Sequence, residues 1–192
     1  MLKKTRNLSL NFKILKFFLI PTILVSTPLV NILQDAKAGI EFQWDQNSGY
    51  KRLRYFQKEN ERRFKNTIYF FLRPSDRSAE LIKLDLKVPK SFKSNLKKEK
   101  ISLCKVRIGG FTARTKCLEN IPADIEINTD ESSLRSLKIY PYSPIPLNKE
   151  NFAIVLKANN PKRSGLYQFH SFGQPKGGTV SSYLGSWTIV ID

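Results

Sequence analysis

The sequence predicts an all-β protein, a two-sheet antiparallel sandwich of immunoglobulin-like architecture with a disulfide-stapled hairpin. Short runs of alternating apolar and polar residues recur from residue 39 onward, and no long stretch keeps a helical period. Glycine and proline separate these runs at a spacing that is typical of sandwich domains. The hairpin is indicated by two cysteines that flank a Gly-Gly turn signal.

The first 38 residues are expected to be a secretory signal peptide. Basic residues precede the apolar run at residues 17–25, and the small-x-small triplet at residues 36–38 stands before Gly39. Cleavage is therefore expected between Ala38 and Gly39. The alternative is a retained membrane anchor, but prolines and polar residues interrupt a segment that would need about 20 apolar residues to span a bilayer. We expect an exported protein of the periplasm, cell envelope or extracellular space, with no spanning helix after cleavage.

The remaining residues 39–192 are enough for a single domain with its own core and too few for two of ordinary size. They keep 27 basic and 15 acidic side chains, a formal charge of +12, and the whole chain carries +17. This excess of positive charge indicates an anionic partner. We expect an anionic polysaccharide, lipopolysaccharide or acidic envelope protein. Nucleic acid is a weaker expectation, because export would separate the domain from it.

A stapled hairpin is expected over residues 101–118. Two cysteines in an exported chain favour a disulfide over a zinc site, because zinc needs about four ligands and the only histidine is His170. A two-residue turn that begins at Gly110 would place Cys104 directly opposite Cys117. This would be a non-hydrogen-bonded pair, where side chains lie closest. The face that holds the cysteines is then expected to point toward the core.

The same register predicts a cationic face on the hairpin. Lys105 would lie opposite Lys116, and Arg107 opposite Arg114. Like charges across a ladder destabilise it, so a bound anion would stabilise this face. We therefore expect these four residues to bind an anion. The alternative is that acids on an adjacent strand, or water and salt, neutralise them.

The strands are expected in the following order. Alternation at residues 40–44 predicts the first strand, and residues 67–73 are apolar on both faces, as in a central strand covered on two sides. Residues 50–65 allow two interpretations: a helix, or a strand over residues 52–57 followed by a charged loop. We favour the strand.

The second half of the chain predicts further strands and one long crossover. Residues 91–100 form either one helical turn or a basic loop, and their length favours the loop. The loop at residues 141–151 contains three prolines and should be an extended crossover. Further strands are expected at residues 81–88, 123–127, 137–139, 152–156, 166–172 and 183–191.

Catalytic motifs are absent from the sequence. His170 has no G-x-S-x-G partner, and we interpret it as a partly buried structural histidine. Asp124 and Glu126 share one strand face but lack the further oxygen ligands that calcium requires. The sequence also lacks a Walker loop, a dinucleotide fingerprint and zinc spacing. We expect a protein that is not an enzyme and has no metal or cofactor. The alternatives are an exported hydrolase with a site near His170 and a purely structural envelope component.

Four stretches carry a resemblance to a known family: FFLRPSD at residues 70–76, CKVRIGGFTARTKC at residues 104–117, SGLYQFH at residues 164–170 and SSYLGSWTIVID at residues 181–192. They resemble a cyanobacterial family of secreted proteins that is described only as a domain of unknown function. The resemblance spans the whole mature chain. It implies a cyanobacterial source and an envelope or extracellular location, but no activity and no catalytic residues. The expected function is that of an exported, non-enzymatic binding module for an anionic surface or partner.

Overall fold

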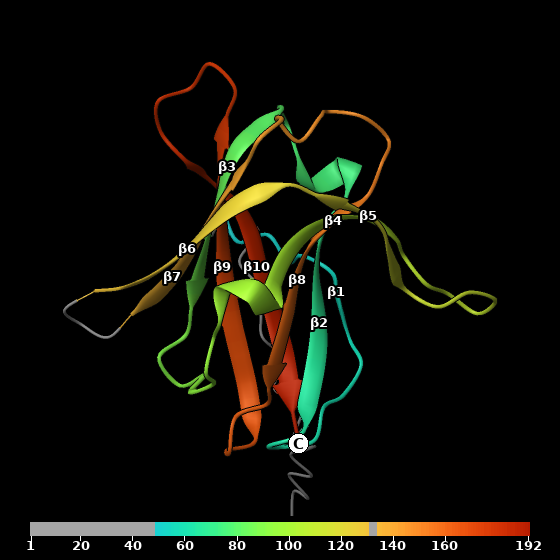
Figure 1. Cartoon of the computed structure of the whole chain (residues 1–192), viewed down its shortest axis with the longest axis vertical. Coiled ribbons are helices and arrows are strands. Elements are labelled where there is room, and N and C mark those ends of the chain that lie inside the picture. The colour runs from blue at the N-terminus through green and yellow to red at the C-terminus, as the bar shows by residue number, and fades with distance from the viewer. Residues whose placement is uncertain (1–48, 131–133) are drawn as a thin grey trace, which may run out of the picture. The chain divides into compact units, whose positions relative to one another are not determined.

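The computed structural model describes residues 49–130 and 134–192 (Figure 1). In this part, ten strands form two five-stranded antiparallel sheets. The first sheet has the order β1 (Tyr55–Gln57), β2 (Lys65–Leu72), β8 (Phe152–Asn159), β4 (Ile101–Arg107) and β5 (Lys116–Ile121). The second has the order β10 (Ser182–Ile191), β9 (Gly165–Pro175), β3 (Leu81–Val88), β7 (Arg135–Pro141) and β6 (Ala123–Thr129).

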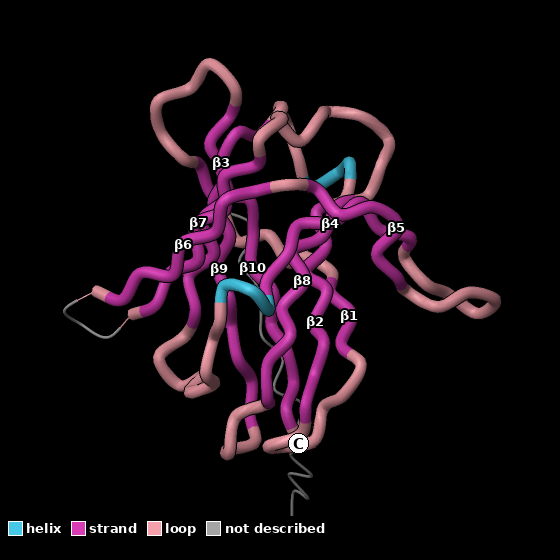
Figure 2. Tube along the Cα trace, viewed as in Figure 1, coloured by secondary structure: helices cyan, strands magenta, loops and turns pink. Residues whose placement is uncertain are grey.

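The prediction of an all-β, two-sheet antiparallel sandwich is confirmed. The only helices in the described residues are two short 3₁₀ turns, η1 (Pro74–Asp76) and η2 (Lys98–Lys100) (Figure 2). The proline-containing loop after β7 leads from the second sheet to β8 in the first, so the predicted crossover is also confirmed. Within the same residues, no helix is long and apolar enough to cross a membrane. The signal peptide and the strand predicted at residues 40–44 lie outside the described residues.

The main core lies between the two sheets. Phe70 of β2 packs on Phe169 of β9 and Trp187 of β10, with ring centroids 4.9 and 5.0 Å from its own. The adjacent Tyr69 and Phe71 point to the opposite side of the first sheet and belong to a second, smaller apolar cluster. Strand β2 is therefore buried on both faces, as its apolar composition predicted.

Residues 50–65 form no helix, and the predicted strand is present in shortened form as β1. Just before it, the N–H of Leu53 donates to the carbonyl of Ser186 in β10, and the N–H of Ser186 donates to the carbonyl of Lys51, both at 2.8 Å. The chain thus pairs first with the edge strand of the second sheet and then, as β1, with β2 of the first. This crossing segment ties the two sheets together along one side.

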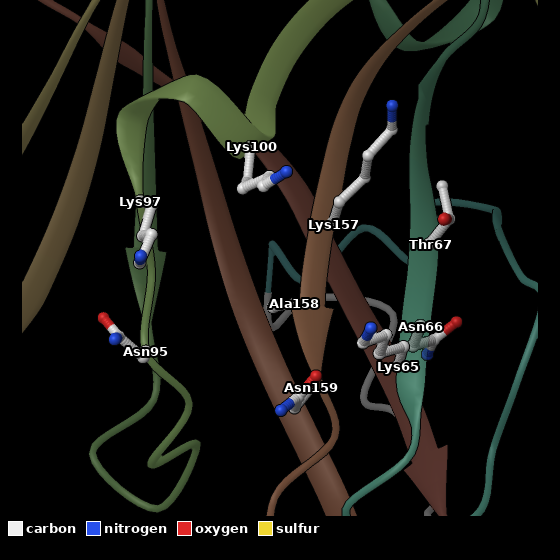
Figure 3. Close-up of a pocket in the computed structure, with 9 residues that line it drawn as sticks. All are labelled: Lys65, Asn66, Thr67, Asn95, Lys97, Lys100, Lys157, Ala158 and Asn159. Atoms are coloured by element: carbon white, nitrogen blue, oxygen red, sulfur yellow. The ribbon is translucent and has the colours of Figure 1, made fainter.

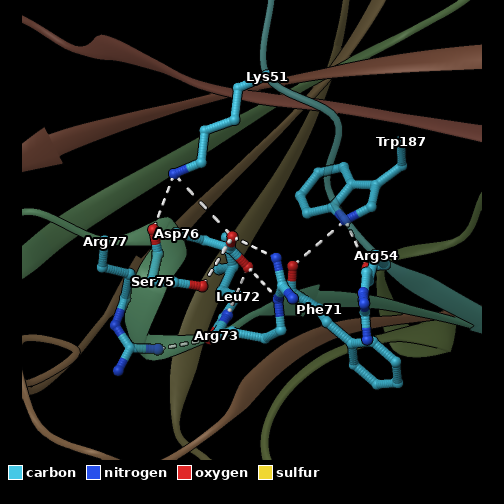
Figure 4. Close-up of polar contacts among 9 residues, drawn as sticks. All are labelled: Lys51, Arg54, Phe71, Leu72, Arg73, Ser75, Asp76, Arg77 and Trp187. Carbon is cyan, nitrogen blue, oxygen red and sulfur yellow. Dashed lines mark hydrogen bonds and ion pairs between the residues drawn. The ribbon is translucent and has the colours of Figure 1, made fainter.

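Two polar anchors strengthen this side of the sandwich (Figure 4). The indole N–H of Trp187 donates to the carbonyl oxygens of Arg54 and Phe71, at 3.0 and 3.2 Å. In η1, the buried carboxylate of Asp76 accepts hydrogen bonds from the backbone N–H and the guanidinium of Arg73, at 2.9 to 3.0 Å. Because buried polar groups are costly unless they are paired, these contacts hold both segments in one position.

Residues 91–100 are mostly loop, as favoured, with η2 at their end. Phe92, which lies in this basic stretch, is fully buried in the main core. Its ring packs edge-on against Tyr167 and Phe169, with centroids 5.5 and 5.0 Å apart. The guanidinium of Arg135 donates to the carbonyl oxygens of Phe92 and Ser94 and so holds the loop against β7.

The Cys104–Cys117 disulfide is confirmed, with Cα atoms 5.6 Å apart. The register predicted for the hairpin is wrong. Cys117 pairs with Val106, and Cys104 lies opposite Asn120. The reason is that the strands are joined by a loop at residues 108–115 instead of a two-residue turn.

The observed register also changes the pairs of cations. Arg107 faces Lys116 rather than Arg114, and Lys105 faces Glu119 rather than Lys116. The ladder contains a β-bulge, which leaves one residue of β5 unpaired and moves the two cysteines out of alignment. Alternation alone does not reveal such an insertion, because it assumes an unbroken period of two.

The cysteine face of β4 is buried, but on the opposite side of the sheet from the main core. Cys104 and Val106 join Tyr69 in the smaller cluster. The main core instead receives Ile101 and Leu103. The expectation that the cysteine face is buried is thus correct for β4. The expectation that this face points into the core between the sheets is wrong.

Candidate anion-binding surface

Of the four predicted anion-binding residues, Lys105 already has an acidic partner. Its ammonium forms an ion pair with Glu150 in the crossover loop and faces Glu119 across the ladder. The hydrogen bond to Glu150 raises the pKa of Lys105, and the same bond lowers the pKa of Glu150. Neutralisation by acids on an adjacent strand was the stated alternative; Lys105 does face Glu119 of the adjacent strand β5, but its ion pair is with Glu150 of the crossover loop.

The structure leaves the other three predicted residues accessible on the hairpin. Arg107 and Lys116 lie opposite each other at the base of the loop, and Arg114 lies within the loop. All three are exposed, and none forms an ion pair with any described residue. The hairpin therefore carries an open cationic group, although its pairs differ from those predicted.

A second cationic region was not predicted. A hollow of about 510 Å³ lies over the first sheet where β2 and β8 meet the loop that precedes β4 (Figure 3). Its lining contains no acid, and its polar residues are asparagines, a threonine and lysines. We call it the lysine groove after its four basic residues, Lys65, Lys97, Lys100 and Lys157.

The register of the first sheet assembles the lysine groove. Lys157 of β8 pairs with Thr67 of β2, two positions from Lys65, so alternation places these three side chains on the outer face. Lys100 immediately precedes β4, which pairs with β8, and this brings it beside Lys157. In Figure 3 the side chains of Lys65 and Lys100 extend toward β8 from its two sides. Lys97 completes the group from the same loop.

The groove concentrates positive charge, and its lining contains no acid to neutralise it. All four lysines are exposed, and in residues 49–130 and 134–192 none of them forms an ion pair. Each ammonium offers three donors, and the neighbouring asparagine amides can donate as well. Lysine binds anions as a compact point charge and not through a rigid fork. Such a groove suits a flexible chain of oxyanions better than one tightly oriented carboxylate.

His170 is more exposed than expected, because it lies on the outer face of the second sheet. Its Nδ1 is 2.7 Å from the Oγ of Ser186, which is also 2.7 Å from the Tyr183 hydroxyl. Ser186 itself has no exposed surface. A serine nucleophile must be reachable by its substrate, so this arrangement does not have the geometry of a hydrolase site.

Four hollows of 250 to 630 Å³ in the described part of the chain are lined by residues other than His170. The described part of the chain also contains no group of three or more histidine, cysteine, aspartate or glutamate side chains that could hold a metal ion. Asp124, one of the paired acids, accepts a hydrogen bond from the Tyr142 hydroxyl.

Comparison with known proteins gives a family and a set of distant structural neighbours. The family model described as "Protein of unknown function (DUF2808)" matches residues 42–191. No curated protein matches the chain.

The structural neighbours include collagen-binding domains of bacterial surface proteins. The collagen-binding subdomain of the Enterococcus faecalis surface protein ACE is 9% identical with a TM-score of 0.37, and the match covers 71% of this chain and 95% of that one. A collagen-binding domain from a Staphylococcus aureus adhesin is 11% identical with a TM-score of 0.36, over the same shares of the two chains. With TM-scores below 0.5, these likenesses carry no argument about function.

Proposed function

We propose that this chain, which belongs to the DUF2808 family, is a non-enzymatic envelope module that binds an anionic polysaccharide in the lysine groove. The observation that carries the proposal is the gathering of Lys65, Lys97, Lys100 and Lys157 around one hollow that has no acid in its lining. Lipopolysaccharide and acidic proteins offer related oxyanions, and lipopolysaccharide is the comparison ligand in the test below.

The physical basis is the mutual repulsion of cations that the fold holds close together. A polyanion lowers this repulsion and releases the counterions that otherwise surround the lysines, so its binding weakens as salt rises. The net charge of +12 on residues 39–192 also favours encounters with anionic polymers. The groove is open and polar, which fits a hydrated ligand rather than an enclosed small molecule.

Export is part of the proposal. The disulfide supports an oxidising compartment. Residues 1–38 then act as a signal peptide with cleavage between Ala38 and Gly39, and the domain works in the periplasm, the envelope or outside the cell. Intact mass and N-terminal sequencing of the exported protein should give a chain that begins at Gly39. A start far from this residue contradicts the proposed cleavage.

The test of ligand binding compares two double variants by retention on immobilised dextran sulfate and on lipopolysaccharide. Lys97→Gln with Lys157→Gln removes two charges from the groove. Lys98→Gln with Lys162→Gln removes the same charge from positions that do not line it. At about 4 Å in water, each ion pair contributes about 1 kcal/mol, so we expect roughly five-fold weaker binding for each groove lysine and a much smaller change in the control.

The outcomes separate three interpretations. A larger loss in the groove variant supports the proposal, and stronger retention on dextran sulfate than on lipopolysaccharide supports the polysaccharide. Equal losses in the two double variants would mean that only net charge matters. If the unmodified domain is not retained at physiological salt, the proposed function is wrong.

A further inference from the structure

The loop between β4 and β5 carries an aromatic side chain that no described residue covers. Phe111 is fully exposed, and in Figure 1 the loop extends beyond β5, away from both sheets. A fully exposed phenylalanine leaves a large apolar area in water. In the described part of the chain, this is the most exposed of the large hydrophobic residues.

The loop is built to hold its tip away from the domain. The N–H of Gly110 donates to the carbonyl of Ala113 at 2.9 Å, and the N–H of Gly109 donates to the Thr115 hydroxyl at 2.8 Å. A Cβ at Gly109 would lie 2.5 Å from the backbone nitrogen of Thr115, so this close turn requires glycine. The disulfide closes the base of the same hairpin. The tip is thus a stapled, internally bonded turn.

The hairpin that carries the exposed ring also carries three exposed cations. Arg107, Arg114 and Lys116 are exposed on the same hairpin, and no acid within the described residues pairs with them. An exposed aromatic tip on a basic hairpin suits a membrane–water interface, where aromatic rings lie at the headgroup level and basic residues attract anionic lipids.

We propose that this hairpin docks on an anionic lipid surface, inserting Phe111 into the interface while Arg107, Arg114 and Lys116 contact the headgroup phosphates. A protein partner fits less well, because a convex tip with one exposed ring lacks the area of roughly 800 Å² per partner that a stable protein interface buries. A bilayer accommodates a convex wedge, since its lipids rearrange around it. This inference is independent of the lysine groove.

The expected binding is weak and separable into two contributions. Each basic residue near an anionic bilayer strengthens binding by about five-fold. Burial of the phenylalanine ring adds roughly ten-fold or more. The whole domain should therefore bind reversibly, more strongly at low salt, and only when the vesicles carry negative charge.

The experiment is sedimentation of the whole mature protein with vesicles of equimolar phosphatidylglycerol and phosphatidylcholine, against pure phosphatidylcholine. Phe111→Ser should weaken binding to the anionic vesicles about ten-fold. Arg107→Gln with Arg114→Gln should weaken it roughly 25-fold. The matched control is Val180→Ser, which removes an exposed apolar side chain from the loop between β9 and β10 and should change nothing.

A second measurement tests directly whether the side chain at position 111 enters the lipid. In Phe111→Trp, the indole emission, taken as a difference from the unmodified protein, should shift to the blue with anionic vesicles and be quenched by lipids that carry brominated acyl chains. An unshifted, unquenched tryptophan would overturn the proposal, as would equal binding by Phe111→Ser and the unmodified protein. Loss of vesicle binding in the Lys97→Gln, Lys157→Gln variant, with the hairpin variants unaffected, would place the lipid at the groove and also overturn it.

Discussion

Replacing Arg77 with methionine should destabilise the domain by about 3 kcal/mol. Arg77 follows η1 and is only 4% exposed. Its guanidinium donates to the carbonyl of Leu72 at the end of β2 (Figure 4), and to the carbonyls of Asn148 and Glu150 at 3.2 and 3.0 Å. It also lies over the Phe152 ring, 4.8 Å from the centroid. One side chain thereby joins β2 to the crossover loop that enters β8.

The predicted loss of about 3 kcal/mol follows from how deeply the carbonyls that accept hydrogen bonds from Arg77 are buried. Hydrogen bonds to charged groups contribute about 1.5–3 kcal/mol each, and the bond to Leu72 is buried. The bonds to Asn148 and Glu150 lie nearer the solvent, so water replaces part of what they contribute. Burial also lowers the pKa of Arg77, which reflects the cost of desolvating its charge. The expected loss of unfolding free energy is therefore that of one strong hydrogen bond plus a fraction of the other two. It is smaller than the sum of all three.

The assay is unfolding in urea, followed by tryptophan fluorescence, to which the buried Trp187 contributes. The matched control is Arg163→Met, an exposed arginine whose loss should change the unfolding free energy by less than about 0.5 kcal/mol. Arg77→Lys keeps the charge but not the planar fork, and should be nearly as destabilised as Arg77→Met. A loss below about 1 kcal/mol in Arg77→Met, or full stability in Arg77→Lys, would refute this account.

Three further predictions concern other parts of the domain. Phe92→Ala should cost about 4 kcal/mol in urea unfolding, because it empties a fully buried aromatic site, and a loss under 1 kcal/mol would contradict that. By NMR titration, Glu150 should ionise below its ordinary pKa of 4.5, and Lys105→Gln should move that pKa upward; an unmoved value would exclude the ion pair. Because folding lowers the pKa of Glu150, its contribution to stability is present above pH 4.5 and is lost as the pH falls through the lower folded value. Alkylation without reduction should label neither Cys104 nor Cys117, and reduction should cost about 3 kcal/mol for the 13-residue separation.

The candidate surface was only partly predictable. The exposed cations of the hairpin, Arg107, Arg114 and Lys116, lie close together in the sequence, so a local pattern was enough to identify them. The ion pair between Lys105 and Glu150 joins residues 45 positions apart, on a strand and a crossover loop, and no local pattern reports it. The two cysteines and the expected export were sufficient to predict the disulfide. The register of the hairpin was predicted wrongly, because the ladder contains a β-bulge and the connecting loop is longer than two residues.

By itself, the sequence determined the sandwich and its strands, because a half-buried strand must alternate and a strand covered on both sides must be apolar throughout. Strand β2 and strand β3 were both predictable for this reason. Only the tertiary structure decided which cations meet. Lys65, Lys100 and Lys157 belong to three separate segments, and the lysine groove exists because β8 pairs with β2 on one side and β4 on the other. Pairing between distant strands depends on the packing of the whole core, which no single stretch of sequence encodes.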